Sequence, residues 1–155
     1  MAYQPREKSE YEEKIIQNNR TSKKIKGGNK VGYAVLVCIG NRKGQVGVAL
    51  GKAPEVATAL HKAVSKAKRA LFTIPLRNNT IPGVVATKFG GASVLLKPAP
   101  AGSGLIAGGA LRIILDLGGV HDVSAKMLGN NNKINNAYAT VKALKLLSAT
   151  IAKRT

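Results

Sequence analysis

Lysine and arginine are the side chains whose number and spacing could do chemistry in this chain. Its 155 residues include 25 Lys and Arg against 7 Asp and Glu, which gives a formal net charge of +18 at pH 7. A surface of one sign repels itself unless a partner of opposite charge neutralises it. Hydrophobic residues make up 45% of the sequence, so the chain can form a packed core. We therefore expect a folded protein with a polyanionic partner, and nucleic acid is the first candidate.

The basic residues gather at places that could contact phosphate groups. They are Lys23, Lys24, Lys26 and Lys30 around Gly27, Gly28 and Asn29, then Arg42 and Lys43, then Lys52, and finally Lys62, Lys66 and Arg69. Glycine at positions 27 and 28 would let an RNA backbone approach closely. The last three cations follow helical spacing and would form one outward line, for which a plain solvated face is an equally good interpretation. With no Trp, 2 Phe and 4 Tyr, base stacking cannot be the main mode, so phosphate, sugar and shape recognition of folded RNA remains.

Residues for catalysis or metal binding are scarce. Cys38 is the single cysteine and lies in an apolar run, which favours a buried, inert thiol. His61 and His121 stand apart, and only three acids follow residue 13. No nucleophile, base and acid stand at a known spacing, and no cysteine cluster could hold zinc. We expect no enzyme, no metal and no cofactor.

A membrane is the weaker alternative partner. No apolar run approaches the roughly 18 to 20 residues of a membrane span, and the first residues lack the apolar segment of a signal peptide. A helix on a membrane surface would present bulky apolar residues, whereas Phe72 and Phe89 are the only Phe and Trp is absent. We expect a cytoplasmic protein without a membrane partner.

The elements that position the first cations predict a small α+β domain. Residues 1–13 are polar and carry four Glu, so we interpret them as a mobile arm. Over residues 14–76, apolar runs at 33–39 and 45–50 and glycine-rich turns predict three antiparallel strands. A helix should follow from Pro54, with its apolar positions on the sheet. Those positions are Val56, Leu60, Ala63, Val64, Ala67 and Leu71.

Residues 77–155 are predicted to form a second small α/β domain, which begins between Pro75 and Pro82. The apolar patterns predict strands at 84–89, 93–97 and 120–127, and helices at 105–117 and 135–151. Arg112 and Asp116 are the only charges in the first of these helices. We expect Arg112 either to meet protein or RNA beyond its helix or to reach solvent along its apolar stem.

Glycines at 102, 104, 108 and 109 lie ahead of or inside the first predicted helix of that domain. Backbone NH groups at such a place could bind an anion. For Gly108 and Gly109, close packing against the sheet is the better interpretation. The spacing is GxGxxxGG, which is not the dinucleotide motif, and residues 47–52 do not complete a P-loop.

Five short motifs follow one another between about residues 14 and 148. They are Lys26-Gly27-Gly28 before the run at 33–39, Gly44-x-Val46-Gly47 with Gly51-Lys52-Ala53, Gly102-x-Gly104 with Ile106 to Ala110 and Arg112, Gly119-Val120-x-Asp122-Val123, and Gly129-x-x-Asn132 with Asn135. With these motifs the sequence resembles the bacterial-type small-subunit ribosomal protein five family. It departs from the family at Asn29, Asn41 and Lys133, where the family usually has a cation, Asp and Pro.

The resemblance implies a first domain like the double-stranded-RNA-binding fold and a second β-α-β-α domain with a left-handed crossover. It implies a structural constituent of the small ribosomal subunit that binds 16S-type ribosomal RNA, supports assembly and influences translational accuracy near the mRNA entry channel. Ribosomal proteins four and eight are implied as neighbours, with mRNA as a further candidate. The Lys23 to Lys30 hairpin would approach head and neck RNA near a spectinomycin site. Gly102, Ser103, Gly104 and Arg112 would face other ribosomal proteins.

Two other function classes stay open. The implied second fold is shared with the galactokinase, homoserine kinase and mevalonate kinase group, and residues 98–104 faintly resemble the phosphate loop of that group. Those kinases are far longer, and Leu105-Ile106-Ala107 lacks the Ser pair expected there. A free-standing regulator that binds double-stranded RNA is the nearer alternative.

Overall fold

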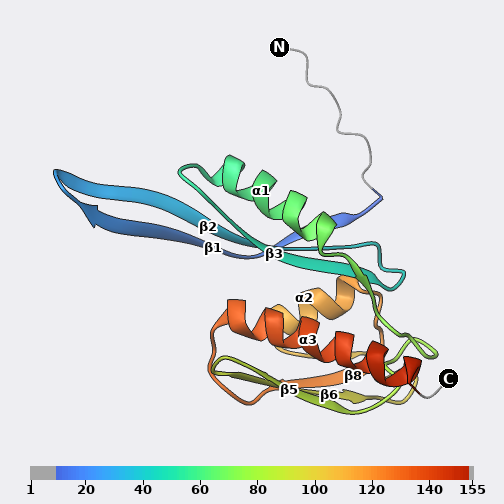
Figure 1. Ribbon diagram of the computed structural model, residues 1–155. Coiled ribbons are helices and arrows are strands. Elements are labelled where there is room, and N and C mark those ends of the chain that lie inside the picture. Colours follow the sequence, from blue (N-terminus) through green and yellow to red (C-terminus); the bar gives the residue numbers. More distant parts are fainter. Residues whose placement is uncertain (1–9, 154–155) are drawn as a thin grey trace.

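The computed structural model describes residues 10–153 and arranges them in four layers (Figure 1). Helix α1 (Val56–Arg69) covers one face of a first sheet, whose other face packs on α2 (Gly109–Leu117) and α3 (Lys133–Ala152). A second sheet lies beneath these two helices. This arrangement confirms the predicted α+β fold of two small domains. The predicted division at residues 76 and 77 stays a prediction.

The first sheet has the order β1-β2-β3-β4, and all its neighbours are antiparallel. Its strands are β1 (Glu12–Ile25), β2 (Gly28–Gly40), β3 (Gln45–Ala53) and β4 (Phe72–Thr73). Three of them were predicted, whereas β4 is too short to give a sequence pattern. Glu12 and Glu13 pair with β2, so the end of the predicted arm belongs to the sheet. Residues 1–9 of the predicted arm lie outside the described residues.

Side chains of β2 alternate between two cores. Val35, Val37 and Ile39 face α1, while Leu36 and Cys38 face α2 and α3. Because both faces are covered, residues 34–40 are all buried, which explains the continuous apolar run in the sequence.

The face of α1 that packs on the sheet differs in part from the predicted one. Its buried stripe is Ala59, Ala63 and Ala67, while Val56 is 37% exposed. The helix begins at Val56, with Glu55 rather than Pro54 at its start. Opposite the alanines, β3 carries Gly47 and Gly51, where a Cβ atom would collide with the carbonyl oxygens of Ala67 and Ala59. Small residues on both sides therefore set the distance between helix and sheet.

The second sheet has the order β5-β6-β8-β7. Its strands are β5 (Val85–Phe89), β6 (Ala92–Pro98), β7 (Leu105–Ile106) and β8 (Val123–Met127). β7 runs parallel to β8, and α2 connects them. The left hand of this crossover stays a prediction. The helix predicted for residues 105–117 is shorter than expected, because Leu105 and Ile106 pair with β8 and the helix begins only at Gly109.

The first turn of α3 is fixed by Asn132, whose side chain accepts a hydrogen bond of 3.0 Å from the Ile134 NH. At its middle, the Lys145 ammonium lies 5.2 Å from the centre of the Phe72 ring on β4, which links the two domains. No helix in residues 10–153 has the length and apolar character to cross a membrane.

Candidate nucleic-acid interface

The β1–β2 hairpin carries the largest group of predicted phosphate-binding residues away from the body of the protein (Figure 1). Its strands pair from Glu12 opposite Gly40 to Ile25 opposite Gly28, and the turn is closed at Gly27 with φ of 92°. That backbone angle favours glycine. Every residue from 20 to 30 is exposed. The hairpin is therefore a long two-stranded arm with a basic, solvent-facing end.

Strand pairing places like charges against each other on this hairpin. Lys23 lies directly opposite Lys30, and Lys24 lies opposite Asn29. Like charges at opposed positions destabilise a sheet. No Asp or Glu occurs between Lys14 and Pro54, and the two acids of β1, Glu12 and Glu13, lie at the other end of the hairpin, opposite Gly40 and Ile39. No carboxylate beside Lys23 and Lys30 on these strands therefore relieves the repulsion. A bound polyanion would relieve it.

Where the outer part of the hairpin meets the end of β3, the structure brings together lysines that lie far apart in the sequence. Lys23 from β1, Lys30 from β2 and Lys52 from β3 line one groove of about 330 Å³, together with Gly32, Tyr33 and Pro54. The hydroxyls of Thr21 and Ser22 also line it, and none of the lining residues is acidic. Cations and hydroxyls around an open groove are the donors that bind phosphate and sugar oxygens.

Helix α1 supplies the second group of predicted residues. Lys62, Lys66 and Arg69 are exposed, as expected, and Lys68 adds a further exposed cation. Lys66, Lys68 and Arg69 lie in the last turn, where positive charge also stabilises the helix dipole. This basic line can therefore serve stability and binding together.

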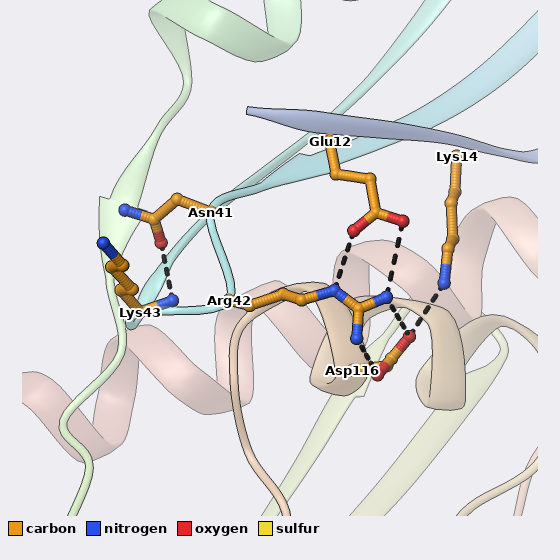
Figure 2. Close-up of polar contacts among 6 residues, drawn as sticks. All are labelled: Glu12, Lys14, Asn41, Arg42, Lys43 and Asp116. Carbon is orange, nitrogen blue, oxygen red and sulfur yellow. Dashed lines mark hydrogen bonds and ion pairs between the residues drawn. The ribbon is translucent and has the colours of Figure 1, made fainter. Parts of the chain in front are cut away.

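The structure places Arg42 in an ion-pair cluster, although the sequence predicted an open basic turn (Figure 2). Its Nε donates to Glu12 Oε2 at 2.7 Å, and its Nη1 donates to Asp116 Oδ1 at 3.2 Å. Lys14 Nζ donates to Asp116 Oδ2 at 2.8 Å. We call Glu12, Lys14, Arg42 and Asp116 the interdomain cluster. A contact between Arg42 and RNA stays a prediction, but two carboxylates already bind its guanidinium.

Backbone hydrogen bonds hold the same turn against the second domain. The Arg42 NH donates to the Leu117 carbonyl at 2.9 Å, and the Gly44 NH donates to the Gly118 carbonyl at 3.0 Å. Carbonyl groups at the end of α2, which have no partner within the helix, are satisfied in this way. Of the two predicted cations, Lys43 remains exposed.

Neighbouring charges shift the pKa values of the cluster. The hydrogen bond from Arg42 lowers the pKa of Glu12, and the hydrogen bond from Lys14 lowers the pKa of Asp116. In the hydrophobic core, burial raises the pKa of the Cys38 thiol to about 12. That thiol therefore stays protonated at neutral pH, as expected for an inert residue.

Residues predicted to face other proteins lie around the loop before β7. Gly102, Ser103 and Gly104 are exposed, and the two glycines have φ of 86° and 73°. The buried Asp122 holds this loop in place, because its Oδ1 accepts a hydrogen bond of 2.9 Å from the Gly104 NH. The sequence pattern did not predict this contact. Arg112 is exposed on α2, and Asp116 pairs with Lys14 and Arg42. The protein contacts of all four residues stay predictions.

Within residues 10–153, no group of three or more His, Cys, Asp and Glu side chains could hold a metal ion. His61 and His121 are both exposed and belong to different domains.

Comparison with protein families agrees with this geometry. The family model described as ribosomal protein S5, N-terminal domain, matches residues 11–75, and the model described as ribosomal protein S5, C-terminal domain, matches residues 87–152. The two matches occur in order and together cover most of the chain. The chain therefore belongs to the ribosomal protein S5 family, whose members have a structural role in the small ribosomal subunit.

Proposed function

We propose that this protein binds 16S-type ribosomal RNA, chiefly through phosphate groups, and so supports assembly of the small subunit and translational accuracy near the mRNA entry channel. Ribosomal proteins four and eight are its proposed neighbours, mRNA is a further candidate, and the cytoplasmic ribosome is its proposed location. One observation supports RNA binding most strongly: an exposed hairpin end with Lys23 directly opposite Lys30 and no Asp or Glu between residues 14 and 54.

Lysine on an exposed arm is well suited to this role. Phosphate contacts fix the position of a protein on a nucleic acid without reading its sequence. Lys24 and Lys26 would hold the RNA at the end of the arm, while Lys23 and Lys30 would hold it in the groove that they share with Lys52. Release of counterions from the RNA would drive this binding.

The triple substitution Lys24→Ala, Lys26→Ala and Lys30→Ala tests the proposal in the full chain. Affinity for small-subunit ribosomal RNA, measured by filter binding at about 0.1 M salt, should fall about tenfold or more. The log-log salt slope should fall in magnitude by about 2 to 3, near one for each lost phosphate contact. The melting curve followed by circular dichroism should barely move, because these side chains are exposed.

A matched control removes the same charge from α3 and its C-cap residue. Lys133→Ala, Lys142→Ala and Lys153→Ala change three exposed lysines on the second domain. This control should bind RNA more tightly than the hairpin variant. Equal affinity of the two variants would contradict a role for the hairpin, and a collapsed melt of the hairpin variant would assign its lysines to folding.

The two alternatives predict different results. The glycine-rich loop is followed by strand β7 and not directly by a helix, which disfavours a kinase-like phosphate loop. Tight binding of ATP would support that alternative. A free-standing regulator should separate from small subunits during sedimentation at high salt, whereas we expect this protein to remain with them.

A further inference from the structure

Helices α2 and α3 cover only one face of the second sheet, and the other face is open (Figure 1). Along β6, Ala92, Val94 and Leu96 are buried, while the residues between them are more exposed. An antiparallel sheet with one face on the core commonly presents the other to solvent. We define the open face by Lys88, Ser93, Leu95, Lys97, Ser124 and Lys126.

Strand register places three lysines on this open face, one from each of three adjacent strands. Lys88 lies opposite Ser93, Lys97 lies opposite Ser124, and Lys126 lies opposite Leu95. Lys97 and Lys126 are diagonal neighbours, so their backbones are about 7 to 8 Å apart. They are close enough to act on one segment of a charged polymer.

Among residues 10–153, no carboxylate forms an ion pair with these lysines. Asp116 and Asp122 are the only acids after residue 76. Asp116 pairs with Lys14 and Arg42, and Asp122 is buried with its Oδ1 on the Gly104 NH. Both acids are thus used inside the protein, and the open face carries charge of one sign.

We propose that the open face binds the phosphate backbone of RNA. The three ammonium groups would contact phosphates, the Ser93 and Ser124 hydroxyls would donate to phosphate or sugar oxygens, and the half-buried Leu95 would lie beneath the lysine stems. This inference rests on RNA as the partner of the protein, and it extends the interface to the second domain. Since α1 lies on the opposite side of the molecule (Figure 1), RNA would then be held on two sides.

The triple substitution Lys88→Gln, Lys97→Gln and Lys126→Gln in the full chain tests this inference against small-subunit ribosomal RNA. Affinity at about 0.1 M salt should fall about tenfold, and the magnitude of the salt slope should fall by about 2 to 3. The matched control is Lys133→Gln and Lys142→Gln on α3 with Lys153→Gln at its C-cap, and this control should weaken binding less. An open-face variant that binds RNA like the original protein, or no more weakly than the control, overturns the inference.

The hairpin variant separates this result from the proposed function. If it weakens binding and the open-face variant does not, RNA remains the partner but the open face is not part of the interface. If neither variant weakens binding, neither the hairpin lysines nor the open face contacts RNA, and both proposals fail. If the open-face variant keeps its RNA affinity but loses a neighbouring ribosomal protein in reconstitution, the face binds protein and the inference fails.

Directed cleavage gives a second, positional readout. Ser124→Cys on the open face and Ser148→Cys on α3 each place a thiol at an exposed position, while Cys38 is buried and will not react under native conditions. With an iron chelate attached, the thiol at position 124 should cut the bound RNA backbone more strongly than the one at position 148. Equal or reversed cleavage contradicts the inference.

Discussion

Asp116 pairs with a cation, Arg42, that the sequence had suggested for RNA binding. It is the single acid of α2, and it binds Lys14 from β1 and Arg42 from the turn after β2. The turn therefore joins the two domains through its side chains as well as its backbone. Exposed ion pairs contribute little to the free energy of unfolding. The main effect of the cluster is therefore to fix the position of the turn against the second domain.

Acid should weaken the interdomain cluster. The pKa values of Glu12 and Asp116 are lowered in the folded protein, so both carboxylates contribute stability above their unfolded pKa values, which are about 4.3 and 3.9. This contribution is lost as pH falls through the lower folded values. Urea unfolding between about pH 6 and pH 3 should therefore show a declining free energy, and Asp116→Asn should reduce the decline.

Glu13→Gln is the matched control for this prediction. Glu13 is exposed and, within the described residues, forms no ion pair. Its substitution should leave the pH dependence nearly unchanged. If Asp116→Asn follows the original curve as closely as Glu13→Gln does, the cluster does not stabilise the folded state.

The sequence shows directly which residues are basic, but it does not predict which of them form ion pairs with Asp or Glu in the folded protein. Arg42 and Asp116 are 74 positions apart, so no local pattern relates them. A lone carboxylate on an apolar helix was the available signal, and it was interpreted through Arg112, its neighbour on the same helix. Within residues 10–153 the hairpin lysines form no ion pair with a distant acid, and they are exposed, as expected.

At the scale of elements, the contact between β3 and α1 depends on the absence of side chains. Gly47 and Gly51 bring the strand against the alanine stripe of the helix. The line of cations on α1 is therefore held in a fixed position relative to the hairpin base.

Gly51→Ala should destabilise the protein by about 1 to 3 kcal/mol, because a Cβ atom at this position meets backbone and side-chain atoms of the helix at Ala59 and Ala63. The melting temperature measured by circular dichroism should fall accordingly. Gly83→Ala is the control, since a Cβ atom there has open space around it. Equal melting temperatures for the two variants would refute the close-packing account.

Element types were predictable where the apolar pattern was long. The runs that became β2 and β3 and the final helix were recognised, because each buries a repeating set of side chains. β4 and β7 were missed, since two-residue strands are defined by pairing with distant segments. The start of α2 was placed too early because Leu105 and Ile106 are as apolar as the helix that follows.

In the whole molecule, the apolar core lies between the two domains and the cations lie on its outside. The two domains share an interior at α2 and α3, and their cations remain on the outer layers and on the hairpin (Figure 1). The excess of positive charge is evident in the sequence, and the apolar pattern predicted the two-domain fold. The open face of the second sheet could not be seen without the strand register, because its lysines are spread over residues 88–126 and belong to three strands.

The salt dependence of RNA binding tests the central claim most directly. Full-length protein should bind small-subunit ribosomal RNA with an affinity that falls steeply as salt is raised. About six neutralised phosphates predict a log-log slope of magnitude roughly 4 to 5, and contacts on the open face would raise it further. An affinity that does not change with salt would contradict phosphate-driven binding and, with it, the role proposed for the basic hairpin.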